Sequence, residues 1–364
     1  MNGRDRPSAP AAATRFQSGI NDAADVAPFL LSRGLLGARA IVDGRLRIED
    51  ASRRNRVFLV TARGAPGYVV KLAAVPGDRG VEREATVLER LAASALAPDR
   101  VLHDAATGVL VLALPEGAHD LAEHHARGRF PVTLARAAGK ALAALHALPP
   151  SILDGVPAAD PHALLAIHRP DLAMLRGMSA AGVELVRLIQ ASAALCARLD
   201  ELLAAPHRVR VVHGDLRWDN LLAVPRPGSR RRTRLLLVDW ELAAVGDPAL
   251  DLGAYLAECL RAWSRYAGIP DPHAPGRRLV DPVRALPSLW PTVAGFWGAY
   301  GGDAALLRRA VQCAGARLVL NAIEEAQSLS ALDDNVRATL QLGANVLARP
   351  EDAATHLLGL PGAA

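Results

Sequence analysis

The chain has 364 residues and a formal net charge of +5, and this length predicts about two domains. Its mean hydropathy of +0.15 is typical of a globular protein, and no apolar run reaches the roughly 18–20 residues of a membrane span. Three distant cysteines and an aromatic content of 4% argue against a disulfide framework, a zinc site and a nucleic-acid surface, so we expect a cytoplasmic protein.

The N-terminal third is expected to form a tail followed by a small, strand-rich lobe. Residues 1–20 lack the apolar core of a secretory signal and are predicted to be a disordered tail. A short amphipathic helix is predicted over 20–37, where glycines close it. The other elements predicted for this lobe are three strands and one helix, over 56–62, 68–73, 109–114 and 80–94.

The remainder of the chain is rich in Ala and Leu and predicts a larger, mostly helical lobe. Long helices are predicted over 131–148 and 178–205, and the chain from about 249 to the end is expected to be helical again. Three short strands lie between them, over 209–213, 219–224 and 235–240. The predicted fold class is therefore α+β, with a tail, an N-lobe and a C-lobe over 1–20, 21–114 and 115–364.

Polar residues are concentrated in VVHGDLRWDNLLAV, residues 211–224, which begins and ends as an apolar strand. Burying an unpaired carboxylate costs several kcal/mol, so two aspartates at this position indicate chemistry. Asp215 is followed five residues later by Asn220, which is the spacing of a kinase catalytic loop. Phosphoryl transfer needs a carboxylate that orients and deprotonates the acceptor hydroxyl, and the spacing assigns this task to Asp215.

A magnesium site requires a further acid beside this loop, because Mg²⁺ takes oxygen ligands that it shares with phosphates. The apolar run LLLVDW delivers Asp239 to the end of a strand. A hairpin between the two strands would bring that end back beside Asn220. We therefore predict that Asn220 and Asp239 hold Mg²⁺.

Lys71 is unusual because only Lys71 and Lys140 are lysines among the 42 basic residues. It interrupts the apolar strand YVVKLA. An edge lysine whose ammonium reaches solvent is the ordinary alternative, but in a chain that otherwise uses arginine we predict a phosphate-binding lysine. On the next helix, Glu84 shares a face with Val81 and Leu88, so it points inward as the partner of Lys71.

The motifs HGDLRWDN, LLLVDWE and GDPALDLG, in this order, resemble the aminoglycoside phosphotransferase/choline kinase family over roughly residues 25–355. HGD and D-W-E distinguish that family from eukaryotic protein kinases. The resemblance implies a two-lobed, protein-kinase-like fold with a small antiparallel sheet in the N-lobe. It also implies transfer of the γ-phosphoryl group of ATP, with Mg²⁺, to a hydroxyl group.

The resemblance also implies roles for individual residues. Asp215 would be the catalytic base, and Arg217 would approach the transferred phosphoryl group. His213 and Asp251 would support the loop rather than touch substrate. The metal ligands would be Asn220 and Asp239, and the phosphate-anchoring pair Lys71 and Glu84.

The nucleotide contacts implied in the N-lobe are less specific. The connector between the lobes would hold adenine, through Ala113, Leu114, Pro115 and Glu116. No G-x-G-x-x-G motif is present, and the expected phosphate-covering loop is EDASRRNRVFLV, residues 49–60, with Ser52 and Asn55 as candidates.

The acceptor stays open between an antibiotic of the aminoglycoside type, a small metabolite alcohol, and a Ser or Thr of a precursor peptide in a biosynthetic pathway with a partner protein. A non-catalytic, nucleotide-sensing pseudokinase is the alternative of another class. The positive net charge and the arginines of 225–234, a predicted hairpin tip, predict that cationic aminoglycosides are poor substrates. HDLAEHH, residues 119–125, is predicted to face solvent. Acids available to an acceptor are Glu258, Glu324, Glu325, Asp333 and Asp334.

Overall fold

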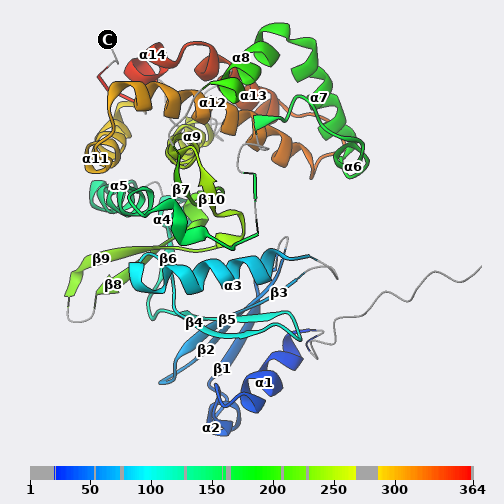
Figure 1. The fold of residues 1–364 in the computed structure, drawn as a ribbon, viewed down its shortest axis with the longest axis vertical. Coiled ribbons are helices and arrows are strands. Elements are labelled where there is room, and N and C mark those ends of the chain that lie inside the picture. The colour runs from blue at the N-terminus through cyan, green and yellow to red at the C-terminus, as the bar shows by residue number, and fades with distance from the viewer. Residues whose placement is uncertain are drawn as a thin grey trace, which may run out of the picture. The chain divides into compact units, whose positions relative to one another are not determined.

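The structure is a computed structural model, which describes residue 20 and the ranges 22–52, 55–73, 78–126, 129–157, 159–160, 165–205, 209–226, 229–267 and 286–361. The predicted tail thus lies almost entirely outside the described residues. The chain divides into two compact units, coloured along the chain in Figure 1. Unit 1 comprises Met1–Glu89 and Asp99–Glu116, and unit 2 comprises Arg90–Pro98 and Gly117–Ala364.

Unit 1 contains a five-stranded antiparallel sheet in the order β1-β2-β3-β5-β4. Its strands are β1 (Leu46–Asp50), β2 (Arg56–Ala62), β3 (Gly67–Leu72), β4 (Arg100–Asp104) and β5 (Val109–Leu114). The three predicted strands are confirmed as β2, β3 and β5. The edge strands β1 and β4 were not predicted, because each mixes charged and apolar residues and β4 carries a register shift that obscures the alternation.

Helices cover both faces of this sheet (Figure 1). On one face, Val26 and Leu30 of α1 (Ala23–Ser32) belong to the same buried cluster as Val70 of β3. The amphipathic helix α3 (Gly80–Leu91) crosses the other face. The short helix α2 (Ala38–Val42) follows α1. Because successive residues of a strand point to opposite faces, the neighbours of Val70 in β3 point toward α3.

Unit 2 contains two small antiparallel sheets. β8 (Leu221–Arg226) pairs with β9 (Ser229–Leu237) and with β6 (His119–Asp120), and β7 (Arg210–Val212) pairs with β10 (Ala244–Gly246). β8 begins two residues later than predicted, because residues 218–220 form a 3₁₀ turn. The predicted hairpin is confirmed by the pairing of β8 with β9, but most of 225–234, which was predicted as its tip, is strand, because β8 runs to Arg226 and β9 begins at Ser229. Residues 227–228 and the arginine side chains of 226–232 lie outside the description.

Helices make up most of unit 2. They are α4 (Leu121–Ala126), α5 (Val132–His146), α6 (Leu172–Arg176), α7 (Ala180–Ala191), α8 (Ala193–Ala204), α9 (Pro248–Ala267), α11 (Trp290–Tyr300), α12 (Ala304–Ala326), α13 (Asp334–Ala348) and α14 (Pro350–Asp352). The central helix α12 packs against α9 and α13. A Cβ on Gly253 would lie 2.6 Å from Cys313 Cβ, and one on Gly315 would lie 2.6 Å from the Leu347 amide nitrogen. Small residues at these crossings therefore allow the close packing.

The segment predicted as one helix over 178–205 is instead two helices, α7 and α8, bent by 87°. The break falls at Ser192, whose hydroxyl accepts a hydrogen bond from the Leu195 amide and caps α8. Apolar periodicity continues through the break, so only the capping serine signals it. No single helix in the described ranges has the length and hydropathy of a membrane span, although this bent pair passes when its halves are combined.

Candidate active site

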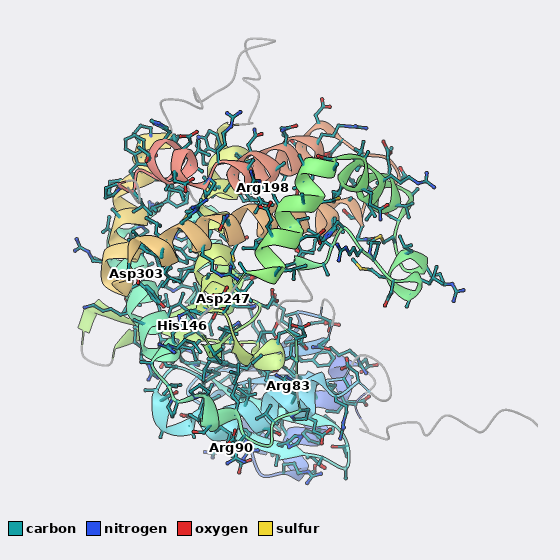
Figure 2. The ribbon with its side chains drawn as sticks, turned by 45° about the horizontal axis from the view of Figure 1, so that its top comes forward. Arg83, Arg90, His146, Arg198, Asp247 and Asp303 are labelled. Carbon is teal, nitrogen blue, oxygen red and sulfur yellow. The ribbon has the colours of Figure 1, made fainter. Side chains whose placement is uncertain are left out.

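The loop that contains Asp215 is braced by Asp251, in the first turn of α9, through hydrogen bonds to the loop backbone. Its buried carboxylate accepts hydrogen bonds from the backbone amides of His213 and Gly214, at 2.7 and 3.0 Å. The same carboxylate lies 3.1 Å from His146 Nε2. Figure 2 shows His146 inside the helical unit, on α5. The backbone that leads into Asp215 is therefore held by a side chain from a distant helix.

The charge of Asp251 depends on this surrounding. Burial by itself would raise the pKa of the Asp251 carboxyl. The hydrogen bond and charge of His146, with the charge and backbone amide of His213, outweigh burial and hold that pKa below its ordinary value. Asp251 is consequently an ionised acceptor at neutral pH, which strengthens both bonds to the loop.

The backbone conformation and surroundings of residue 214 explain why glycine lies between His213 and Asp215. The φ of Gly214 is +83°, in the left-handed region that L side chains rarely adopt. A Cβ at this position would also lie 2.4 Å from the carbonyl oxygen of Leu242. The backbone of the loop thus passes directly against the segment that follows Asp239, and only glycine fits there.

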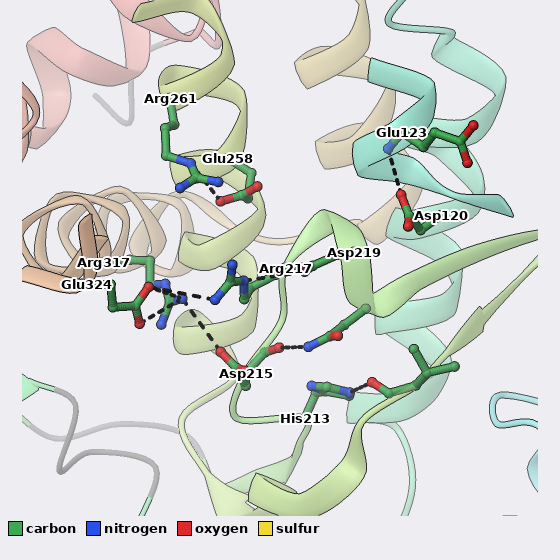
Figure 3. Close-up of polar contacts among 12 residues, drawn as sticks. Asp120, Glu123, His213, Asp215, Arg217, Asp219, Glu258, Arg261, Arg317 and Glu324 are labelled. Atoms are coloured by element: carbon green, nitrogen blue, oxygen red, sulfur yellow. Dashed lines mark hydrogen bonds and ion pairs between the residues drawn. The ribbon is translucent and has the colours of Figure 1, made fainter. Parts of the chain in front are cut away.

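His213 ties the loop to the end of β9. Its Nε2 lies 2.9 Å from the Val238 carbonyl oxygen, which can only accept, so Nε2 carries the proton (Figure 3). The ring is fully buried and lies against Trp240, with centroids 4.8 Å apart. This geometry suits the supporting role predicted for His213, which stays a prediction.

The two predicted metal ligands lie at neighbouring strand ends. Asn220 immediately precedes β8, and its backbone carbonyl accepts a hydrogen bond from the Val238 amide at 3.0 Å. Asn220 Nδ2 donates to the backbone carbonyl of Asp215 at 2.8 Å, so the amide group is oriented with Oδ1 as its remaining ligand atom. Asp239 follows β9 and has a φ of +69°, a rare conformation for a residue other than glycine.

These residues fit a magnesium ion by their chemistry. One carboxylate and one oriented amide oxygen are the hard donors that Mg²⁺ prefers. Asn220 is buried and Asp239 is half-buried. The left-handed backbone at Asp239 turns the chain sharply at the strand end, where it begins a 3₁₀ turn.

A group of charged side chains lies beside Asp215, as Figure 3 shows. Arg317 of α12 places Nη2 3.6 Å from Asp215 Oδ1 and 3.5 Å from Glu324 Oε1. Arg217 lies 3.3 Å from Asp219 Oδ1 and 3.7 Å from Glu324 Oε2. Glu324 thus lies between the two arginines. Burial by itself would lower the pKa of Arg217, but the carboxylates of Asp219 and Asp215, with others, hold it above its ordinary value, so Arg217 stays charged.

The candidate acceptor acids fall into two sets. Glu258 pairs with Arg261 at 3.2 Å, and Arg261 also lies 3.2 Å from Glu325, so both acids are paired with an arginine of α9. Burial raises the pKa of the Glu258 carboxyl, although Arg261 and other arginines oppose the shift. Asp333, by contrast, caps α13, and Asp334 occupies the first turn of that helix.

A small pocket of unit 2 opens beside the catalytic loop. Among its described lining residues, Asp215 and Arg317 are the charged ones. The remaining wall is largely apolar and includes Leu165, Leu216, Leu250 and Leu320. The pocket therefore places the predicted base and one arginine beside an apolar wall.

In unit 1 the structure brings together Lys71 and Glu84, as predicted. Lys71 Nζ lies 2.8 Å from both carboxylate oxygens of Glu84. The exposed fractions are 7% for Lys71 and 1% for Glu84. A buried ion pair is a weak source of stability, because desolvation opposes the attraction. A buried pair between β3 and α3 therefore favours a functional explanation over a stabilising one.

The predicted phosphate-covering loop, residues 49–60, differs from the expectation. Residues 49–60 are mostly strand rather than loop, because β1 ends at Asp50 and β2 begins at Arg56. The Ser52 hydroxyl accepts a hydrogen bond from the Val57 amide at 3.0 Å and stabilises this turn. Asn55 is half-buried in the same turn, and residues 53–54 lie outside the description.

The connector residues end unit 1. Ala113 and Leu114 close β5, and the Ala113 amide donates to the Asp99 carbonyl at 2.9 Å. Pro115 and Glu116 follow as the last residues of the unit. Their predicted contacts with adenine stay predictions.

Two features were missed or misassigned from the sequence. The sequence did not single out His146 and Arg317, which approach the loop from other helices. HDLAEHH was expected to face solvent, but His125 is buried, with its ring centroid 4.0 Å from that of Trp218. His125 follows the buried Leu121 by one helical turn, and that spacing was the available signal. Burial and the charge of His124 lower the pKa of His125 to about 3, so its ring is neutral.

An antiparallel sheet with a buried Lys–Glu pair, and a mostly helical unit with a braced Asp-containing loop, define a protein-kinase-like fold. The predicted fold class is confirmed. The chain belongs to the phosphotransferase enzyme family, whose model, APH, matches residues 47–279, more than half of the chain.

Solved structures support this fold. A choline/ethanolamine kinase family protein from Mesorhizobium loti is 20% identical, with 89% of this chain and 94% of that chain covered and a TM-score of 0.51. The Plasmodium vivax ethanolamine kinase is 13% identical, with 90% and 88% covered and a TM-score of 0.51. A macrolide 2'-phosphotransferase type I is 19% identical, with 88% and 97% covered and a TM-score of 0.50. No curated protein matches the sequence.

Proposed function

We propose that this protein transfers the γ-phosphoryl group of ATP to a hydroxyl group of a small molecule, in a Mg²⁺-dependent reaction with Asp215 as the base. The observation that carries this proposal is the braced loop. Asp251 and Gly214 hold the backbone before Asp215, and Asn220 bonds to the backbone of Asp215 itself. The loop therefore presents its carboxylate to the pocket with little freedom.

In the proposed reaction, Asp215 accepts the proton of the acceptor hydroxyl as its oxygen bonds to the γ-phosphorus. The bond from that phosphorus to the β–γ bridging oxygen breaks, and ADP leaves. Arg217 supplies positive charge near the transferred group. Asn220 and Asp239 would hold Mg²⁺, which when bound supplies charge neutralisation to the phosphates. Lys71, oriented by Glu84, would anchor the phosphates of ATP.

The names of the similar proteins support a small acceptor rather than a peptide. Two of them are kinases named for choline or ethanolamine, and the third is a phosphotransferase named for macrolides. Each of these acceptors is a small molecule that carries a hydroxyl group. The pocket beside Asp215 is also small, and its described walls come mainly from the loop 214–216, α9 and α12 of one unit.

The test is transfer of labelled phosphate from ATP to a panel of small alcohols, amino alcohols, hydroxy acids and a serine peptide, with and without Mg²⁺. Asp215→Asn should lower turnover by about 10²–10⁴-fold, the usual loss with a general base. Binding of Mg-ATP should stay within a few-fold, because the base meets the acceptor and not the nucleotide.

The matched control is Asp303→Asn, an aspartate that caps α12, since either residue caps a helix well. This variant should retain full turnover. Turnover of Asp215→Asn close to that of the control would contradict the assignment of the base. Binding of Mg-ATP without transfer to any acceptor class would instead favour a nucleotide-sensing protein.

A further inference from the structure

Two charged residues belong to the described lining of the pocket, Asp215 and Arg317, and the proposed reaction gives Arg317 no role. It enters from α12, and its side chain is 10% exposed, whereas that of Asp215 is 23% exposed. A guanidinium at this depth in an apolar wall is costly unless something compensates for lost hydration. Its role in the folded chain therefore needs an explanation.

The contacts of Arg317 with the chain are loose. Its shortest approaches to Asp215 and Glu324 both run through Nη2, at 3.6 and 3.5 Å. Charge-assisted hydrogen bonds are shorter, at about 2.7–2.9 Å. A planar guanidinium offers five N–H donors in a fork. The long contacts with Asp215 and with both Glu324 oxygens all run through Nη2 and do not saturate it. Arg317 is therefore poised to bind a further anion.

The position of Arg317 determines where that anion would lie. An acceptor hydroxyl must come within hydrogen-bond distance of Asp215, about 2.6–3.2 Å, to lose its proton there. Since Arg317 Nη2 is 3.6 Å from that carboxylate, substituents a bond or two from the carbinol carbon would reach the guanidinium. The rest of the acceptor would meet Leu216, Leu250 and Leu320.

The neighbouring acids do not make this a pocket for a cation. Glu258 and Glu325 face Arg261, and Glu324 lies between Arg217 and Arg317. None of these three glutamates belongs to the described lining of the pocket. An ammonium group entering beside Asp215 would meet the Arg317 guanidinium at close range.

We infer that Arg317 selects the acceptor, and that the acceptor is an apolar hydroxy acid whose carboxylate lies close to the reactive hydroxyl. The carboxylate pairs with the Arg317 fork while the hydroxyl faces Asp215 and the hydrocarbon part lies against the leucines. This inference deepens the proposed function and rests on it.

Three probes with one skeleton test the inference: 3-hydroxyoctanoate, 3-hydroxyoctanamide and 1-aminooctan-3-ol. They share the hydroxyl and the hydrocarbon tail, and they differ in carrying an anionic, a neutral or a cationic group. Titration calorimetry with the full chain should show the acid binding about 10- to 100-fold more tightly than the amide, the range for a charged hydrogen-bonded pair. The amine should bind most weakly.

Arg317→Met should remove the preference for the acid and leave amide binding within a few-fold. Arg317→Lys, which keeps the charge without the fork, should retain part of the preference. The control is Arg308→Met on the same helix, because Arg308 is exposed and pairs with Glu351 at 2.9 Å. It should leave the preference of the wild type unchanged.

Two results would overturn the inference. One is equal or weaker binding of the acid than of the amide in the wild type. The other is an equal loss of kcat for all acceptors in Arg317→Met with the acid preference intact, since Arg317 would then only position Asp215. If the acid preference appears and depends on Arg317 but no phosphate is transferred, the binding site stands and the proposed function fails.

Discussion

Buried charged side chains are paired differently in the two units, as a comparison of the Lys71–Glu84 pair with the charged group around Asp215 shows. In unit 1 one lysine nitrogen meets both oxygens of one glutamate at 2.8 Å, and both side chains are buried. In unit 2 the charges are spread over the loop, α9 and α12, with approaches of 3.2–3.7 Å.

This difference has a chemical consequence. The tight pair of unit 1 fixes one ammonium in one place, which suits a binding partner of invariant structure such as a triphosphate. The looser group of unit 2 leaves donors of Arg317 unsaturated and Asp215 partly open, which suits a site that must receive an acceptor. The ion pair of unit 1 is therefore the closer one, and the side chains around the braced loop of unit 2 are the more loosely paired.

The largest expected effect comes from breaking the tight pair with Lys71→Arg. The planar guanidinium is larger than the ammonium and cannot place one nitrogen between both Glu84 oxygens. We expect kcat/KM to fall by about 10²-fold or more, a loss comparable to that of one electrostatic donor in an active site. Circular dichroism should show an intact fold.

Lys140→Arg provides the matched control for this prediction, because Lys140 is the other lysine of the chain and is exposed on α5. Steady-state kinetics should not distinguish it from the wild type. If Lys71→Arg retains most of the activity, the choice of lysine in the strand has no chemical reason.

The brace of the unit 2 loop is tested by Gly214→Ala beside Gly155→Ala. Both glycines have positive φ, +83° and +79°, but a Cβ meets the Leu242 carbonyl at Gly214 and open space at Gly155. Alanine in the left-handed region costs about 1–2 kcal/mol at either site. Overpacking adds about 1–3 kcal/mol at Gly214 only.

The difference in unfolding free energy between the two variants isolates the overpacking contribution at Gly214. Phosphate transfer then shows whether that overpacking affects the site. We expect Gly214→Ala to be the less stable variant and the only one of the two with reduced turnover. Equal stability and equal activity of the pair would show that the close approach to Leu242 does not constrain the loop.

The smallest expected effect is a pH dependence of stability that Glu258, in unit 2, causes. Burial raises the pKa of Glu258 in the folded chain above its unfolded value, so the folded state binds the proton more tightly. This contribution to stability is fully present below the unfolded pKa and is lost as pH rises through the folded pKa. Glu258→Gln removes the titration.

The melting temperature of Glu258→Gln relative to the wild type should therefore rise by a few degrees between about pH 4 and pH 7. Glu184→Gln offers a control, since Glu184 is exposed and pairs with Arg337 at 3.2 Å on the surface. A difference that does not change with pH would show that Arg261 keeps Glu258 ionised in both states.

The sequence by itself determined the parts of this protein that depend on local spacing. The rarity of lysine in an apolar strand and the helical periodicity around Glu84 predicted that Lys71 and Glu84 form a pair, and the structure confirms the contact. The interval from Asp215 to Asn220 and the apolar run before Asp239 predicted neighbouring strand ends, and the pairing of β8 with β9 confirms this. In each case the partners are close in the sequence, with Lys71 and Glu84 13 residues apart.

Only the tertiary structure decided which side chains approach from elsewhere. His146 and Asp251 are 105 residues apart, and their contact follows from the packing of α5 and α9 around β7. Arg317 reaches Asp215 because small residues let α12 pack closely on α9. No local period encodes such contacts, since they depend on how helices cross and on the volumes that fill the space between them. The arginine that we assign to acceptor selection is visible only once those helices are packed.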